Sequence, residues 1–119
     1  MNKIYLLFYL FLIPLTCKSQ NPCKNIQTSF NNYNQALSAV KSADFIYVDN
    51  VTTERSSWIR GAKFYSCNKS TGFLIIKTDK REFIHQNVPI SVWNNFKLSD
   101  SFGSFYSRNI RRNYKIFIK

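Results

Sequence analysis

Residues 72–88, GFLIIKTDKREFIHQNV, contain the pattern from which the architecture of this chain is predicted. Its two β-prone halves flank a tight polar turn at Thr78–Lys80, which predicts a β-hairpin. Because Phe73–Ile76 is apolar at every position, the first of the two strands has no face suited to water. We therefore expect that strand in the middle of a sheet, with both of its faces covered.

A further strand is predicted before the hairpin. Residues 56–67, SSWIRGAKFYSC, show a period of two, and Gly61 indicates a bulge or bend among them. The alternation divides the apolar residues between two faces, with Ile59 on one and Trp58, Ala62 and Phe64 on the other. A short β-prone run at 45–48 lies further upstream. The sequence thus predicts an antiparallel β-meander of three or four strands.

An amphipathic helix is predicted before the meander. Residues 24–42 place apolar side chains three and four positions apart, at Ile26, Phe30, Tyr33, Leu37 and Val40. The opposite face is polar, so we expect the apolar stripe to pack on the rest of the domain.

Helices are also predicted after the meander. Pro89 stands where a helix begins, and the apolar stripe that follows consists of Val88, Val92, Trp93 and Phe96. Ser99 or Asp100 is expected to cap a second helical segment. The apolar positions of that segment are Phe102, Phe105, Tyr106, Ile110 and Tyr114.

These elements predict a small single α+β domain with an N-terminal amphipathic helix, an antiparallel three- to four-stranded β-meander and C-terminal helices packed on one face. We expect residues 1–20 to be a secretory signal, 21–55 the N-terminal helix and linker, and 56–119 the main domain. The last residues, 114–119, are expected to add an edge strand guarded by lysines.

The order of residues 1–20, MNKIYLLFYLFLIPLTCKSQ, is that of an export signal. Lys3 precedes an apolar run at 4–13, and a short polar stretch follows Pro14. The run is about half of the ~20 residues that a helix needs to cross a bilayer, which disfavours a permanent anchor. We expect an exported protein of the periplasm, the cell envelope or the extracellular space.

Two cleavage routes remain open. One is ordinary cleavage near Ser19 or Gln20, and the other is lipidation of Cys17, which follows the lipobox-like Leu15-Thr16. Both routes leave Cys23 and Cys67 as a pair of thiols in an oxidising compartment. That setting favours a Cys23–Cys67 disulfide.

Positive charge dominates the chain, with 17 Lys and Arg against 6 Asp and Glu, a net charge of +11. Removal of residues 1–20 takes away Lys3 and Lys18 and leaves 15 − 6 = +9. Five cations and no acid fall within 108–119: Arg108, Arg111, Arg112, Lys115 and Lys119. Such a run either attracts a polyanion or keeps the protein soluble, and the sequence leaves both interpretations open.

The inventory of chemically reactive residues argues against an enzyme. One histidine and three cysteines are too few for a zinc ribbon or a Cys/His nucleophilic site. The six acids include no close pair on one predicted face. We therefore expect no catalytic residue, no metal site and no cofactor.

Several short patterns from residue 56 onward resemble the KTSC domain, a module found at the C-terminus of some lysyl-tRNA synthetases and as stand-alone bacterial proteins. The family's opening S-x-x-I is matched by Ser56 and Ile59, its first-strand tyrosine by Phe64, and its second-strand apolar positions by Phe73 and Ile75. Its V-P-x-x-v-y-x-x-L segment is matched by Val88, Pro89, Val92, Trp93 and Phe96. Its S-x-G-x-[YF] and I-R-x-x-Y ending is matched by Ser101, Gly103, Phe105, Ile110, Arg111 and Tyr114. The resemblance implies a non-catalytic module, for which RNA binding is supposed because of the synthetase fusion.

Six residues are candidates for ligand binding. Phe83 and His85 share a strand face and, with Tyr65 or Phe64, would form a stacking surface for bases or sugars. The alternative has Phe83 in the core and His85 as a partly exposed polar neighbour. The other four are the cations Arg108, Arg111, Arg112 and Lys115. For Arg111 the family pattern allows a structural role instead, in a pair with Glu82 or Asp100.

These observations favour an exported binding module that contacts a polyanion such as lipopolysaccharide, an acidic polysaccharide or nucleic acid. The alternatives are a protein-interaction or structural role in the envelope, with another envelope protein as the partner, and RNA binding as in the synthetase-fused relatives. Contact with a membrane is expected only through a lipid on Cys17.

Overall fold

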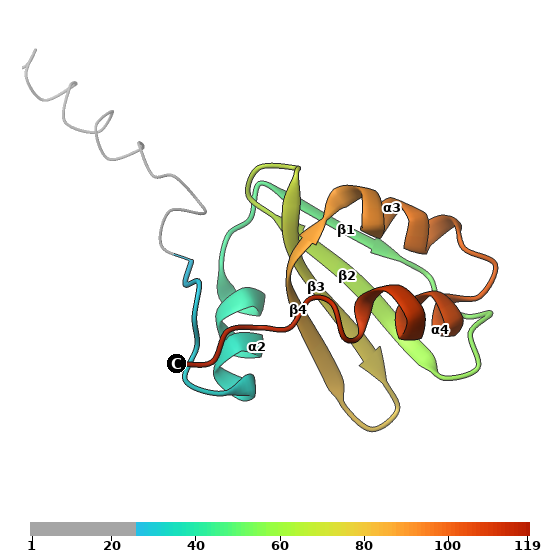
Figure 1. Ribbon diagram of the computed structural model, residues 1–119, viewed down its shortest axis with the longest axis horizontal. Helices are drawn as coiled ribbons and strands as arrows, with labels where there is room; N and C mark the ends of the chain where they lie inside the picture. Colours follow the sequence, from blue (N-terminus) through green and yellow to red (C-terminus); the bar gives the residue numbers. More distant parts are fainter. Residues whose placement is uncertain (1–25) are drawn as a thin grey trace, which may run out of the picture.

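The computed structural model describes residues 26–119 (Figure 1). The expected secretory signal, Cys17 and Cys23 lie outside these residues. Within 26–119, none of the helices combines the length and the apolar character that crossing a bilayer requires. The elements are, in chain order, α2 (Tyr33–Ser42), β1 (Tyr47–Val51), β2 (Ile59–Ser66), β3 (Thr71–Thr78), β4 (Glu82–Pro89), α3 (Ile90–Leu98), α4 (Phe102–Phe105) and the π-helix η1 (Tyr106–Ile110).

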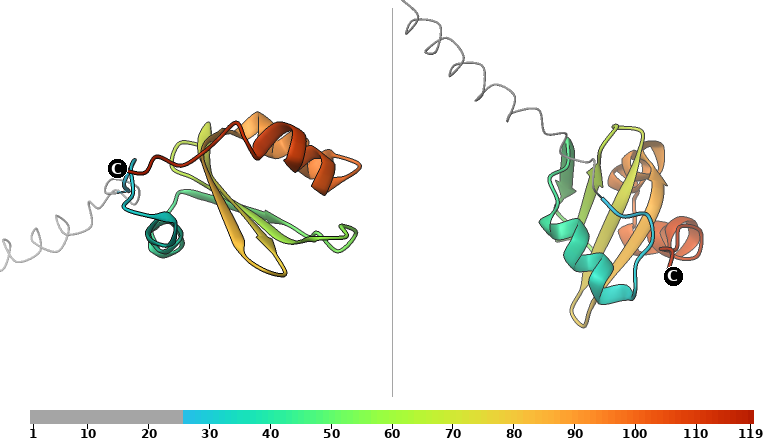
Figure 2. Two further views of the ribbon diagram at one scale, coloured as in Figure 1. Left: turned by 60° about the horizontal axis from the view of Figure 1, so that its bottom comes forward. Right: turned by 90° about the vertical axis from the view of Figure 1, so that its left-hand side faces the viewer.

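The four strands form one antiparallel sheet in the order β1-β2-β3-β4. Figure 2 shows α2 on one face of this sheet and the C-terminal helices α3 and α4 on the other. The predicted α+β domain, with a meander and C-terminal helices on one face, is confirmed.

β3 has both faces covered, as its continuous apolar run predicts. Leu74 and Ile76 are fully buried in the core under α3, α4 and η1. Phe73 and Ile75 point the other way, into a second core that includes Ala36 and Val40 of α2. The sheet is therefore the middle layer of three.

The sheet begins upstream of residue 56. β1 pairs with β2 along its whole length, from Tyr47 opposite Ser66 to Val51 opposite Ala62. Residues 47–51, which fall in the expected linker, therefore belong to the same domain as the strands that follow.

The expected faces of β2 need a correction. Ile59 lies in the same core as Ala62 and Phe64, on the side of the C-terminal helices. The pairing of β2 with β3 shifts register between Ile59 and Gly61. A bulge of this kind inserts one residue and so reverses the alternation beyond it.

The first helix starts later than the spacing of apolar residues predicts. Asn32 caps α2, with its side-chain oxygen accepting a hydrogen bond from the Gln35 N–H at 2.8 Å. Phe30, which is fully buried, therefore precedes the helix. Its N–H donates to the Phe117 carbonyl at 2.8 Å, and its carbonyl accepts from the Lys119 N–H at 2.9 Å.

The C-terminal segment also departs from expectation at two places. The cap of α4 is Ser101, whose hydroxyl accepts from the Ser104 N–H, and not Ser99 or Asp100. Residues 114–119 form no strand and make only single bridges, between Lys115 and His85 and between Ile118 and Phe30. The backbone of this segment forms hydrogen bonds partly with β4 and partly with Phe30, so it makes no continuous ladder with either. Figure 1 shows the C-terminus beside α2.

The outer edge of β4 is closed by side chains as well as by this tail. The Tyr33 hydroxyl accepts from the Ile84 N–H at 2.8 Å and donates to the Ile84 carbonyl at 3.2 Å. The next outward N–H, that of Gln86, donates to the Tyr114 carbonyl at 3.2 Å. The Gln86 side chain donates to the Thr28 carbonyl and accepts from the Phe117 N–H. These bonds occupy the groups through which another strand would pair.

Asp49 ties β1 to α3. Its carboxylate accepts from the indole N–H of buried Trp93 at 2.8 Å and from the ammonium of Lys97 at 2.7 Å. Trp93 in turn stacks on Phe64 and Phe96, with ring centroids 5.6 and 5.8 Å apart. The hydrogen bond from Lys97, and the weaker one from Trp93, hold the pKa of Asp49 below its usual value.

His85 joins the sheet to the C-terminal segment. Its Nδ1 lies 3.1 Å from the Tyr114 carbonyl, so Nδ1 carries the proton and donates. Nε2 then accepts from the Tyr106 hydroxyl at 2.8 Å. Burial disfavours the charged imidazolium and lowers the pKa of His85 to about 4, although the bond to Tyr114 acts in the other direction.

We predict that Asp49→Ala lowers the free energy of unfolding by about 1–3 kcal/mol, because the buried Trp93 N–H loses its acceptor. Urea unfolding followed by fluorescence measures the change. The matched control is Asp79→Ala, which removes the exposed pair with Arg60 and is expected to cost less than about 1 kcal/mol. Equal losses in the two variants would contradict the role given to Asp49.

Because His85 is buried and neutral, we expect the free energy of unfolding to fall as the pH is lowered below about 6.5. In that range the unfolded chain binds a proton that the folded chain does not bind, until the pH reaches about 4. The loss should total about 3 kcal/mol and should be absent from the pH profile of a His85→Asn variant. His85 is the chain's one histidine, so its NMR titration is unambiguous, and a midpoint near the ordinary value of about 6.5 would refute the assignment.

Candidate functional site

Four of the six candidate binding residues line one pocket, of about 340 Å³. β4 contributes Phe83 and His85, and the segment after η1 contributes Arg111 and Lys115. We call this cavity the tail pocket, because the C-terminal tail forms one of its walls. Its other lining residues are Tyr33, Ile84, Tyr106, Ile116 and Ile118.

His85 contributes a buried side chain to the lining of the tail pocket. It is 4% exposed, and both of its ring nitrogens are engaged, one with Tyr106 and one with Tyr114. Phe83 is partly buried, with its ring 6.4 Å from that of Tyr106. Phe83 therefore packs against the core, as the alternative expects, whereas His85 is buried and not the partly exposed neighbour that the same alternative expects.

The four candidate cations are all exposed and follow or belong to η1. Arg111 and Lys115 line the tail pocket, whereas Arg108 and Arg112 do not. The ion pairs among residues 26–119 use the other cations Lys41, Arg60 and Lys97. The expected partner Glu82 is paired with Lys41, and neither it nor Asp100 forms an ion pair with Arg111, so the structural pairing of Arg111 is wrong.

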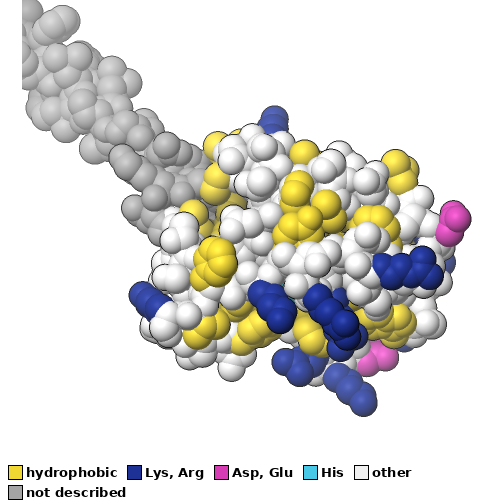
Figure 3. Space-filling model, viewed as in Figure 1, with side chains coloured by type: hydrophobic (Ala, Val, Ile, Leu, Met, Phe, Trp, Pro, Cys, Tyr) yellow, Lys and Arg dark blue, Asp and Glu magenta, His cyan; other side chains and the backbone are white. Residues whose placement is uncertain are grey.

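Figure 3 shows how this charge is distributed over the face that carries the C-terminal helices. Lys and Arg side chains form a broken band across its lower half, and few acidic side chains interrupt them. We call Arg108, Arg111, Arg112 and Lys115 the basic C-terminal surface. Its potential is positive because its cations have no acidic partner within the described residues.

Two tyrosine hydroxyls in the lining of the tail pocket have raised pKa values. Burial, and then the neighbouring Tyr33, raise the pKa of Tyr106 far above its usual value, while the charges of Arg111 and Arg81 act against this rise. The pKa of Tyr33 is also raised by burial, against its bond with the Ile84 backbone and the charge of Arg81. Both hydroxyls therefore stay neutral in the tail pocket.

Arg81 is a residue that the sequence analysis missed. Its guanidinium lies 4.8 Å from the centre of the Phe83 ring. It also lines a cavity of about 290 Å³ with Trp58 and Phe83, next to the tail pocket. The signal was present in the sequence, since Arg81 directly precedes β4 and stands two positions before Phe83, a spacing that favours the same face of an extended chain.

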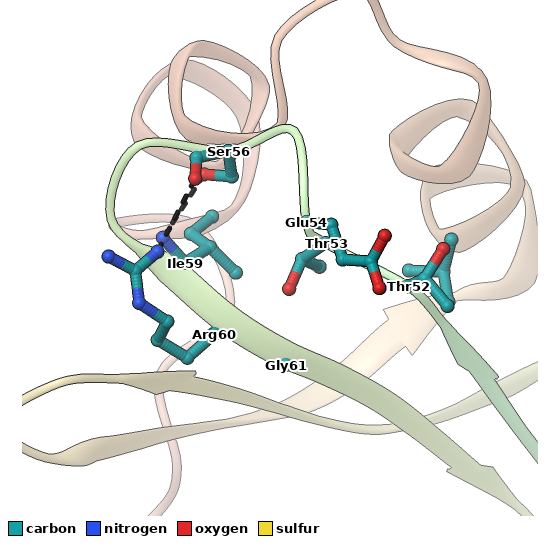
Figure 4. Close-up of a pocket in the computed structure, with 8 residues that line it drawn as sticks. Thr52, Thr53, Glu54, Ser56, Ile59, Arg60 and Gly61 are labelled. Carbon is teal, nitrogen blue, oxygen red and sulfur yellow. Dashed lines mark hydrogen bonds between the residues drawn. The ribbon is translucent and has the colours of Figure 1, made fainter.

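The largest of the cavities described here, about 580 Å³, lies elsewhere, in the loop between β1 and β2. Figure 4 shows its lining, which includes Thr53, Glu54 and Arg60, with Arg60 donating to the Ser56 carbonyl at 3.3 Å. None of the candidate residues lies in it. Residues 26–119 hold no group of three or more His, Cys, Asp or Glu side chains able to bind a metal ion.

The residues that carry the family resemblance are mostly structural. Ile59, Phe64, Val88, Trp93, Phe96 and Ile110 are buried in the core under the C-terminal helices. Ser101 caps α4, and a Cβ on Gly103 would clash with the indole nitrogen of Trp58. Arg111 is different, because it is exposed and makes no ion pair within the described part of the chain.

The comparison with protein families gives one match. The family model described as the KTSC domain matches residues 70–114, a range that contains β3, β4, α3, α4 and η1. No curated protein and no solved structure matches the chain. The family match agrees with the resemblance in the residues and with the fold that they build, and the chain therefore contains a KTSC domain.

Proposed function

We propose that the protein is an exported, non-catalytic binding module that contacts a polyanion through the basic C-terminal surface. The observation that carries the proposal is the set of four exposed cations, Arg108, Arg111, Arg112 and Lys115, which have no acidic partner among residues 26–119. Exposed cations clustered without acids attract polyanions and are rarely needed for folding. Lipopolysaccharide, acidic polysaccharides and nucleic acid all carry the required charge.

The export part of the proposal rests on the sequence of residues 1–20, in which Lys3 precedes a short apolar run and a polar end. An exported protein meets the anionic polymers of the envelope and of the surrounding medium. It also meets an oxidising environment, in which a Cys23–Cys67 bridge is favoured.

A role in protein interaction is supported by a different observation. Ile46 and Val48 are 55% and 46% exposed, and they lie at or beside β1, an edge strand of the sheet. Apolar side chains at such an edge suit pairing with a strand of another envelope protein.

Charge reversal at Arg108 and Arg112 tests the polyanion proposal. The double variant Arg108→Glu/Arg112→Glu is expected to lose binding to heparin, lipopolysaccharide and an oligonucleotide, with little change in melting temperature because both side chains are exposed. Wild-type affinity for the oligonucleotide should fall with salt, with a log-log slope of about −0.7 to −0.9 for each phosphate contacted.

The matched control is Lys63→Glu/Lys77→Glu, which changes the net charge equally on the opposite face of the sheet, beside Tyr65 and Ile75 of the α2 core. This control should retain most of the affinity. Equal losses in the two double variants would show attraction to net charge alone. The proposal fails if the wild type binds none of the three polymers at about 150 mM salt.

The disulfide between Cys23 and Cys67 is tested on protein recovered from its native host. Thiol labelling of the denatured, unreduced chain should modify neither residue, and labelling after reduction should modify both. In the chain-entropy model a bridge that closes a loop of about 45 residues contributes about 4 kcal/mol, so reduction should lower the melting temperature clearly. Labelling of Cys67 without reduction would exclude the bridge.

A further inference from the structure

The tail pocket has an apolar lining and a cationic rim. Six of its nine lining residues are aliphatic or aromatic: Tyr33, Phe83, Ile84, Tyr106, Ile116 and Ile118. These residues come from α2, β4, η1 and the C-terminal tail, so the cavity exists only in the folded chain. Ile118 is 52% exposed, which leaves apolar surface accessible to a ligand.

The neutral polar groups of the lining are already engaged. The Tyr33 hydroxyl is bonded to both backbone groups of Ile84, and the Tyr106 hydroxyl to His85. The remaining nitrogen of His85 is bonded to Tyr114. A ligand body rich in hydroxyls or amides would therefore find few partners here, and an apolar body fits better.

The two cations of the lining are not engaged in this way. Arg111 and Lys115 make neither an ion pair nor a side-chain hydrogen bond within residues 26–119, and both are exposed. A guanidinium and an ammonium beside one cavity are suited to a single carboxylate or phosphate. The charged end of a ligand would stay at the rim while its apolar part enters the pocket.

We propose that the tail pocket binds an amphipathic anion, with one carboxylate or phosphate held by Arg111 and Lys115 and a short apolar chain against Phe83, Ile84 and Ile118. The volume of about 340 Å³ is at the low end for small-molecule sites, so the chain is short. The inference rests on the proposed function in one respect, the negative charge of the ligand, because Arg111 and Lys115 belong to both sites.

Titration of the protein with octanoate, octyl phosphate and octanol tests this site. Calorimetry gives the affinities, and amide NMR shifts give the location. Octanoate or octyl phosphate should shift the signals of residues 83–85 and 115–118, and the preference between them identifies the carboxylate or the phosphate as the recognised group. Octanol lacks the charge and should bind about five- to tenfold more weakly than the better of the two anions.

Two variants test the cationic rim and the apolar wall of the tail pocket independently. Arg111→Gln and Ile118→Asn should each weaken binding of the better anion about five- to tenfold, and both positions are exposed enough to leave the fold intact. The matched control Arg108→Gln removes the same charge from a neighbouring position outside the pocket and should leave the affinity unchanged. Equal losses in Arg111→Gln and Arg108→Gln, or shifts that map elsewhere, would overturn the inference.

The two proposals fail separately. A wild-type protein that binds octanoate or octyl phosphate in the tail pocket but none of the polymers would refute the proposed function and support this inference. A protein that binds the polymers but neither anion would refute this inference and leave the proposed function standing.

Discussion

Both faces of β3 are covered, and this requirement determines where the helices of the domain lie. Four consecutive apolar residues, Phe73–Ile76, alternate between the two faces of the sheet, and all four are buried. A strand of this kind cannot tolerate water on either side, so the chain must supply one cover before the sheet and another after it. α2 supplies the first, and α3, α4 and η1 supply the second. The position of η1 then fixes where the basic C-terminal surface lies.

The general architecture could be predicted because it depends on the periodicity of apolar residues, which the sequence displays directly. The errors fall where a local interaction overrides that periodicity. The bulge between Ile59 and Gly61 moves Ile59 to the other face, and the cap formed by Asn32 starts α2 well after Ile26 and Phe30. The tail could not be predicted as a set of single bridges, because its partners, Phe30 and Gln86, are distant in sequence.

The sequence predicts which residues the candidate site contains, but it does not predict that four of them line one cavity. A run of cations is visible in any sequence, and Arg111 and Lys115 were identified from it. Which cations meet an apolar cavity depends on the π-helical turn, in which the Arg111 N–H donates to the Tyr106 carbonyl five residues back. That turn is a geometric detail with no clear sequence signal. The contribution of Tyr33 was equally hidden, because its hydroxyl reaches Ile84 across 51 positions of the chain.

The unequal edges of the sheet bear on how copies of this domain can associate. The β4 edge is closed by the Tyr33 hydroxyl and by the tail, whereas β1 has no pairing strand on its outer side among residues 26–119. Fibre growth by strand addition needs two open edges on every unit, so that each addition creates a site for the next. A unit with one open edge joins a single neighbour, and the pair that results has no edge left to extend. The hydroxyl of one tyrosine thus helps to close one of the two edges through which repeated strand addition would proceed.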